Sequence, residues 1–272
     1  MYSHLAVAVD FSDISTRLLE QIDEFRQFGI CRLTLIHVRE VGYPVTAPAT
    51  SDDHFKERLA SEAERLEEAG WDVNTVHVRG RPANQIVAAA EKVDADLIAV
   101  GNKGHGAVSE VLLGSVATEV LERAKRPVFL YCDDEEQTSP IVGDTVVYPT
   151  DFSESADDAL SAIAGIGHPT VVLHVMDSGG SKKADIEEAR RDELDERRRR
   201  LEEAGVSEVT TRFEFGRPRK IVTSMLDDHP GALCVMGTQG RGRLSDMVLG
   251  GVTRKVARRG THHMLVVPAA TD

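Results

Sequence analysis

The amino-acid sequence predicts an α/β protein of two doubly wound parallel sheets, each with five strands. Short apolar runs alternate with amphipathic helical segments along the chain, which is the pattern of parallel sheets covered by helices on both faces. The order of these segments occurs twice in the sequence. A glycine-rich turn follows the fourth predicted strand of each half, as expected where a strand passes into a helix beside a ligand.

The first half contains all the elements of one such sheet. Ser12 is suited to cap a helix that continues to about Phe28, and Gly70 is suited to end a charged helix that starts near His54. Pro82 opens a third helix, and residues 41–53 are predicted to be a loop. Apolar runs predict strands at 5–9, 32–38, 71–78, 95–100 and 127–131, and a fourth helix covers 115–125.

The second half repeats the landmarks of the first, so we predict a tandem duplication. The repeated segments are Asp-Phe-Ser at 10–12 and 151–153, Leu-Glu-Glu-Ala-Gly at 66–70 and 201–205, and Gly-Arg-Pro at 80–82 and 216–218. An acidic, polar stretch with one proline separates the halves and is predicted to be a linker. The predicted domains are therefore 1–132 and 144–272, with a linker at 133–143.

Composition limits the class of partner. The net charge is −13, from 45 acidic and 32 basic residues, and this argues against nucleic acid and against an anionic membrane surface. The excess of acid over lysine suits a cytoplasm of high salt, although an ordinary acidic protein is the alternative. Three cysteines without metal or disulfide spacing suit a reducing compartment. Because the sequence has neither a signal-peptide pattern nor a long apolar run, we expect a soluble cytoplasmic protein.

The two glycine-rich turns are candidate phosphate-binding loops. Glycine lets the backbone approach a ligand closely, and the amides at a helix N-terminus favour an anion. The first loop has Gly101, Gly104 and Gly114, followed by Ser115. The second loop has the same spacing, with Gly237, Gly240 and Gly250.

Residues at other strand ends could complete a nucleotide site. Asp10 ends the first strand and could accept hydrogen bonds from ribose hydroxyls, and the backbone of Val38 could contact a base edge. The alternatives are a turn-forming or capping role for Asp10 and a plain N-cap role for Ser115. The recurrence of aspartate at Asp151 favours the ligand-binding interpretation, although duplication also preserves scaffold residues.

Several better-known sites are absent from the sequence. It contains no Walker A motif, no Gly-x-Gly-x-x-Gly after a first strand, no nucleophile elbow and no zinc-protease motif. His37 and His174 hold equivalent strand positions and are expected to be structural. His262 and His263 are adjacent, but two ligands do not make a credible metal site.

The loop spacing Gly-x₂-Gly-x₉-Gly-Ser, together with an early strand that ends in Asp10, resembles the universal stress protein family over nearly the whole chain. The resemblance implies a Rossmann-like sheet with strand order 3-2-1-4-5, which places strands one and four side by side. It implies ATP binding, with AMP or ADP and a role for Mg²⁺ left open. The implied site residues are Asp10, Val38, Gly101, Gly104, Gly114, Ser115 and Val116, with Asp151, Val175, Gly237, Gly240 and Gly250 in the second half.

The second loop departs from the family pattern. Gly251 stands where the family has serine or threonine, and loss of that hydroxyl bond to a phosphate would cost on the order of 1.5–3 kcal/mol. Arg241 and Arg243 give the second loop more positive charge than Lys103 and His105 give the first. The first half is therefore the favoured site, and the second is a possible one.

The function that the sequence supports is a non-catalytic, adenine-nucleotide-binding regulator of the stress response. A nucleotide-free, partner-binding module is the alternative, and a slow ATPase using Glu110 is a third. The resemblance also implies that the two halves form an intrachain pseudo-dimer, in which residues 128–130 pair with residues 265–267. Two chains could pair further as a homodimer.

Overall fold

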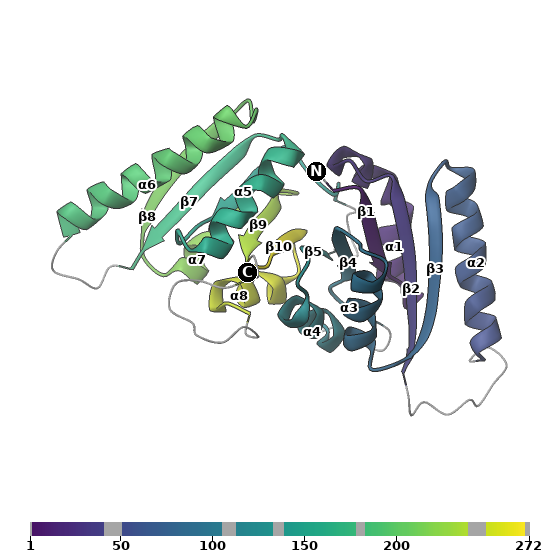
Figure 1. Ribbon diagram of the computed structural model, residues 1–272. Helices are drawn as coiled ribbons and strands as arrows, with labels where there is room; N and C mark the ends of the chain where they lie inside the picture. Colours follow the sequence, from purple (N-terminus) through teal and green to yellow (C-terminus); the bar gives the residue numbers. More distant parts are fainter. Residues whose placement is uncertain are drawn as a thin grey trace. The chain divides into compact units, whose positions relative to one another are not determined.

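A computed structural model of the protein describes residues 2–40, 51–104, 113–132, 139–177, 183–238 and 249–269. The chain divides into two compact units, Met1–Tyr131 and Cys132–Asp272. Each unit consists of a parallel sheet with helices packed on it (Figure 1). The units are described in turn.

The first unit has its five strands in the order β3-β2-β1-β4-β5, all parallel. This is the predicted order, and it places β1 between β2 and β4. The elements are β1 (His4–Ala8), α1 (Asp13–Glu20), the 3₁₀ helix η1 (Ile22–Phe28), β2 (Arg32–Glu40), α2 (Asp52–Glu68), β3 (Asp72–Gly80), α3 (Pro82–Lys92), β4 (Leu97–Gly101), α4 (Ser115–Arg123) and β5 (Val128–Tyr131).

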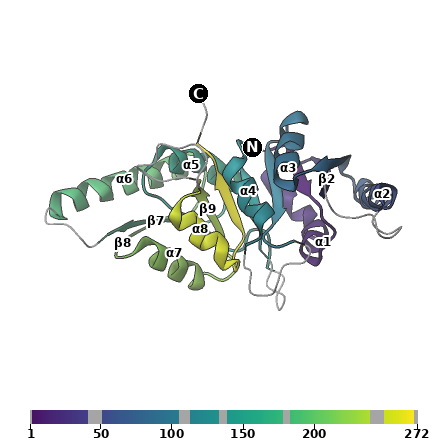
Figure 2. The ribbon, with the colours of Figure 1, turned by 90° about the horizontal axis from the view of Figure 1, so that it is seen from below.

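The second unit repeats the architecture, with the strand order β10-β9-β6-β7-β8. Figure 2 shows β7 and β8 between α6 on one side and α7 on the other. The elements are β6 (Val146–Pro149), α5 (Glu154–Ile166), β7 (Thr170–Met176), α6 (Lys183–Glu203), β8 (Val209–Phe215), α7 (Pro218–Asp227), β9 (Leu233–Gly237), α8 (Gly251–Arg259) and β10 (Met264–Val267).

The core of each unit is built from the apolar runs that predicted its strands. Every residue of β1 and β5, and of β6 and β10, is buried. The outer strands β3 and β8 are partly exposed along their length. Strands covered on both faces are apolar throughout, whereas an outer strand tolerates polar residues. The central strands of each sheet are thus the buried ones.

Two predicted helix boundaries in the first unit are wrong. The helix expected from Ser12 to about Phe28 ends at Glu20 and continues as a 3₁₀ helix from Ile22. Gln21 interrupts it with φ −93° and ψ 9°, and its side-chain oxygen accepts a hydrogen bond of 2.6 Å from the hydroxyl of Tyr131. The next helix begins at Asp52, before the predicted start, because Ser51 caps it. Residues 41–50 of the predicted loop lie outside the described residues.

The described end of the predicted linker packs into the second unit. Ile141 and Val142 are buried. The backbone N–H of Gly143 donates to the carbonyl of Gly231 over 3.1 Å, and a Cβ atom at Gly143 would lie 2.5 Å from that same oxygen. Glycine at 143 is therefore required by the close approach of two backbones. Residues 133–138 of the predicted linker lie outside the described residues.

Candidate functional site

The first glycine loop starts at the carboxyl end of β4 and returns to the N-terminus of α4. A Cβ atom at Gly101 would lie 2.6 Å from Cγ2 of Ile14, so only glycine lets α1 pack this closely on the strand end. The loop is closed by a 2.6 Å hydrogen bond from the N–H of Gly114 to the carbonyl of Asn102. The third glycine of the motif is thereby held next to the second, since a Cβ atom at Gly114 would lie 3.9 Å from the backbone nitrogen of Gly104.

Asp10 and Gly104 meet across the ends of β1 and β4. A Cβ atom at Gly104 would lie 2.8 Å from Oδ2 of Asp10. The other carboxylate oxygen, Oδ1, accepts hydrogen bonds from the N–H of Ser12 over 3.0 Å and from its hydroxyl over 2.6 Å. The carboxylate that the sequence assigned to ribose binding therefore lies against the loop that the sequence assigned to phosphate binding.

Val38 lies on β2, at the same end of the sheet as Asp10 and Gly104. The pairing of β1 with β2 ends at Ala8 and Ile36, and the N–H of Val9 donates to the carbonyl of Ile36 over 2.8 Å. Val38 lies two residues further along β2, so its backbone N–H and C=O point the same way as those of Ile36, past the end of β1. This is the position from which backbone groups can contact a base.

The N-terminus of α4 completes the first site. Gly114 is the N-cap residue, and Ser115 is the first residue of the helix, with an exposed side chain. Ser115 is therefore not the N-cap, which was the alternative role considered for it. Val116 follows it and is half-buried. The hydroxyl of Ser115 and the first amides of α4 thus lie at the N-terminus of the helix, which is the end that favours an anion.

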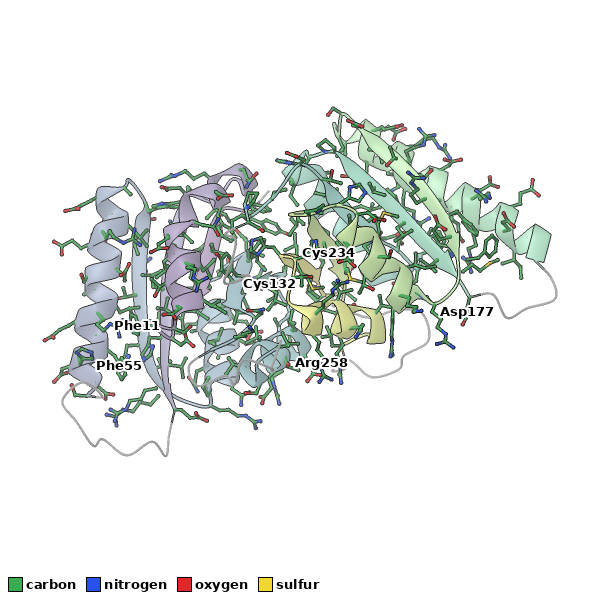
Figure 3. The ribbon with its side chains drawn as sticks, turned by 180° about the vertical axis from the view of Figure 1, so that it is seen from behind. Phe11, Phe55, Cys132, Asp177, Cys234 and Arg258 are labelled. Atoms are coloured by element: carbon green, nitrogen blue, oxygen red, sulfur yellow. The ribbon has the colours of Figure 1, made fainter. Side chains whose placement is uncertain are left out.

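A histidine supports the turn that carries Asp10. The Nδ1 atom of His37 lies 2.7 Å from the carbonyl oxygen of Val9, and burial lowers the pKa of His37. Phe11, with φ 60°, lies with its ring centre 5.1 Å from the His37 ring. Figure 3 shows Phe11 beside Phe55, and their rings are stacked 6.1 Å apart. A positive φ costs energy for a residue with a side chain, so this packing holds the turn in place.

A histidine also supports the equivalent turn in the second unit. The Nδ1 atom of His174 lies 2.8 Å from the carbonyl oxygen of Thr150, and burial lowers the pKa of His174. Phe152 also has φ 60°, and its ring centre lies 4.3 Å from that of His174. These repeated contacts agree with the structural role expected for His37 and His174.

The second glycine loop is closed like the first. The N–H of Gly250 donates to the carbonyl of Thr238 over 2.7 Å, one residue after Gly237 at the end of β9. Asp151 accepts a 3.1 Å bond from the N–H of Ser153, as Asp10 does from Ser12. Val175 lies two residues beyond Leu173, where the pairing of β6 with β7 ends. Residues 105–112 and 239–248 of the two loops lie outside the described residues, and they include Gly240, His105, Glu110, Arg241 and Arg243.

Two further residues lie at these loops and were not predicted from the sequence. Asn102 is fully buried, and neither its Oδ1 nor its Nδ2 has a hydrogen-bond partner among the described residues. In the second unit, the guanidinium group of Arg219 lies against Gly251 at the start of α8. A comparison of the residues that follow the two Gly-Arg-Pro segments would have drawn attention to Arg219, because Ala83 is its counterpart.

The part of the chain that the structure describes contains no group of three or more histidine, cysteine, aspartate or glutamate side chains able to hold a metal ion. Within the same ranges, no helix is long and apolar enough to cross a membrane.

The fold and the loops define a tandem α/β protein with two glycine loops at strand ends. The model of the universal stress protein family matches residues 1–131 and 143–268. The chain therefore belongs to the universal stress protein family and contains its domain twice.

Similar proteins agree with this assignment. Universal stress protein YxiE of Bacillus subtilis is 26% identical over 48% of this chain and 99% of its own length. Universal stress protein Mb2028c of Mycobacterium bovis is 26% identical over 82% of this chain and 83% of its own. The crystal structure of a universal stress protein from Archaeoglobus fulgidus covers 98% of both chains, with a TM-score of 0.76 and 24% identity, and supports the two-domain fold.

Proposed function

We propose that this protein binds an adenine nucleotide, ATP in the first instance, in its first domain, and that it regulates the stress response in the cytoplasm without catalysing turnover. The observation that carries the proposal is the approach of the Asp10 carboxylate to the backbone of Gly104. It joins an acceptor suited to ribose hydroxyls to a loop suited to phosphates. Val38 would contact the base from the end of β2.

The chemistry of the residues fits a bound nucleotide rather than a reaction. Oδ1 of Asp10 already accepts two hydrogen bonds from Ser12, and these bonds fix the orientation of the carboxylate. Gly101, Gly104 and Gly114 would offer backbone amides, and Ser115 a hydroxyl, to the phosphates. We expect Mg²⁺ to accompany the triphosphate, because Mg²⁺ is held largely through substrate phosphates.

Calorimetric titration with ATP, ADP and AMP tests the proposal. It should be done at low and at high salt, because the chain has a net charge of −13. Ser115→Ala should weaken ATP binding by about tenfold or more, since it removes a hydrogen bond to a charged group. Ser61→Ala is the matched control, because Ser61 is an exposed serine on α2, away from the loops.

Two further measurements decide between nucleotide binding and its alternatives. Mass analysis of small molecules retained by the native protein should find an adenine nucleotide. No detectable binding at millimolar ATP would refute the proposal and favour a nucleotide-free, partner-binding module. Steady release of phosphate above background would refute the non-catalytic part alone.

A further inference from the structure

Helices α7 and α8 of the second domain carry an excess of positive charge. They lie side by side (Figure 2), and Arg259 of α8 pairs with Asp227 of α7. Together their sequences contain six basic residues and one acidic residue, a net charge of +5. The equivalent helices of the first domain, α3 and α4, contain two basic and three acidic residues, a net charge of −1. The positive charge therefore belongs to the second domain and is not a property of the repeated fold.

The exposed cations of α7 and α8 form one surface. The buried side of α8 consists of Thr253, Val256 and Ala257. Helical spacing places Lys255 and Arg258 on the opposite side, and both are exposed. The first turn of α7 adjoins the first turn of α8. The basic face is defined as the exposed residues Arg217, Arg219, Lys220, Lys255 and Arg258.

The cations of the basic face are not neutralised by the chain itself. In the described ranges, none of them is paired with a carboxylate. By contrast, arginines of α6 pair with acids of the same helix, such as Arg191 with Glu187 and Arg198 with Glu202. Lys220 lies in the first turn of α7, where the helix dipole disfavours a cation. Carboxylates from another molecule would therefore relieve the repulsion within this face.

The outer side of α2 in the first domain has the opposite charge. The helix contains seven acidic and three basic residues, and its buried residues are Leu59, Ala63 and Leu66. Helical spacing places three exposed carboxylates on the opposite side of the helix, and these form the acidic stripe: Glu57, Glu64 and Glu68. Among the described residues, no cation is paired with any of the three.

The acidic stripe is also electrostatically unfavourable within an isolated chain. Glu64 and Glu68 are four residues apart, so their like charges repel one another on the helix surface. Glu68 is the last residue of α2, at the end where the helix dipole disfavours an anion. The stripe thus lacks the counter-charges that the basic face has in excess.

We propose that the basic face of one chain binds the acidic stripe of a second copy of the chain. The two surfaces are complementary in charge, and neither is neutralised within the described part of the chain. Because the contact joins two different surfaces, it associates copies head to tail, either closing on itself or adding further copies. Exposed ion pairs are individually weak and are screened by salt, so the association is weak and salt-dependent. It requires no nucleotide and goes beyond the proposed function.

A long polyanion fits the basic face less well than a second copy does. Helices of ten and nine residues extend only about 15 Å, and the acidic stripe spans about 17 Å along α2. Since α7 and α8 carry +5 in a chain of net charge −13, the rest of the chain carries −18. A nucleic acid or an anionic membrane would extend past the basic face and be repelled by this acidic remainder.

Sedimentation velocity of the full chain without nucleotide measures the association. It is recorded over a range of protein concentrations, at about 20 mM and at about 500 mM salt. Two charge-reversed variants test the two surfaces. Lys255→Glu with Arg258→Glu alters the basic face, and Glu64→Lys with Glu68→Lys alters the acidic stripe. A fourfold variant combines all of these substitutions.

Lys92→Glu combined with Lys125→Glu is the matched control. Both lysines are exposed and lie in the first domain, outside the acidic stripe. The control changes the net charge by the same amount as the basic-face variant, so it reports any effect of general repulsion between copies. It should associate like the unaltered protein.

The sedimentation coefficient of the unaltered protein should rise with protein concentration at low salt and not at high salt. Each charge-reversed variant should associate more weakly by about tenfold or more. The fourfold variant should regain association, because it carries the same ion pairs with their signs exchanged. An equimolar mixture of the two charge-reversed variants should also associate, since the reversed face of one is complementary to the reversed stripe of the other.

A sedimentation coefficient that is independent of protein concentration at low salt would overturn the proposal. So would a loss of association in the control as large as that in the basic-face variant, or the absence of recovery in both the fourfold variant and the mixture. Binding of a short DNA duplex that is lost in the basic-face variant, without self-association, would assign the face to nucleic acid instead. Each of these outcomes leaves the proposed nucleotide site standing, because no nucleotide is present.

Discussion

Asp10 and Gly104 approach so closely that a Cβ atom at position 104 would lie 2.8 Å from the Oδ2 atom of Asp10. The two residues are distant in the sequence and meet because β1 pairs with β4 in the sheet. Ligands of doubly wound sheets bind at this kind of position, where the strand order reverses. The contact ties the proposed ribose acceptor to the proposed phosphate loop.

This contact predicts that Gly104→Ala weakens nucleotide binding in the first domain. The added methyl group must displace the Asp10 carboxylate or the loop, because 2.8 Å is too short for a carbon–oxygen contact. We expect ATP affinity to fall by about tenfold, or about 1.4 kcal/mol. Calorimetric titration of ATP measures the change.

Gly165→Ala provides the control for that variant. A Cβ atom at Gly165 would have no neighbour within 4 Å, and the residue lies in α5. The substitution should leave ATP affinity unchanged and stabilise the helix by about 0.5–1 kcal/mol. Equal affinities for the unaltered protein and Gly104→Ala would contradict the proposed role of the contact.

The contact between Arg219 and Gly251 in the second domain predicts a non-additive result. Gly251→Ser alone introduces a Cβ atom 2.5 Å from Nη2 of Arg219, so the arginine must move away from the helix terminus. Gly251→Ser combined with Arg219→Ala reproduces the arrangement of Ser115 and Ala83. We expect the double variant to bind ATP in its second domain more tightly than Arg219→Ala does, by about tenfold.

A double-mutant cycle read by site-resolved hydrogen exchange measures the coupling between these two positions. Neighbouring residues that share a ligand show coupling energies of about 0.5–3 kcal/mol. Strictly additive effects of Gly251→Ser and Arg219→Ala would show that the two residues act independently.

The regular parts of this fold could be predicted from the sequence because they depend on local patterns. Apolar runs and alternating helices predicted ten parallel strands, and the duplicated segments predicted two similar units. The loop glycines were recognisable because their spacing is the same in both halves. The closed turns at Gly114 and Gly250 then follow from that shared spacing.

The missed features depend on contacts between segments that are far apart in the sequence. Arg219 reaches Gly251 only because α7 packs against α8. The helix after Ser12 breaks at Gln21, whose side chain accepts a hydrogen bond from Tyr131 in the last strand of the unit. The positive φ of Phe11 is likewise held by packing on other elements rather than by its own preference. No periodicity in the sequence carries such information.

The thiols of the protein should differ sharply in reactivity. Cys31 is exposed, whereas Cys132 and Cys234 are buried, and burial raises the pKa of Cys234. Since the thiolate is the reactive form, Ellman's reagent should modify one thiol in the native protein and three after denaturation. Cys31→Ser should abolish the native reaction. Rapid modification of a second thiol in the folded protein would contradict the burial of these side chains.

The last prediction concerns acid and His263, whose side chain is 3% exposed. Its Nδ1 atom accepts a 3.1 Å hydrogen bond from the N–H of Cys132, and burial lowers its pKa to about 4. At a pH between about 4 and the ordinary histidine pKa of 6.5, His263 is protonated in the unfolded chain and neutral in the folded chain. Stability is therefore retained above pH 6.5 and is lost as the pH falls toward 4.

His263→Asn isolates this contribution, because the asparagine carbonyl oxygen can accept the bond from Cys132 and does not titrate. We expect urea unfolding of the unaltered protein to lose about 2 kcal/mol more than that of the variant between pH 7 and pH 5. Comparing the pH dependence of the two proteins cancels the contributions that they share. It also cancels any loss of stability that the substitution causes at pH 7. Parallel loss of stability in the two proteins would mean that His263 is not the buried group that titrates.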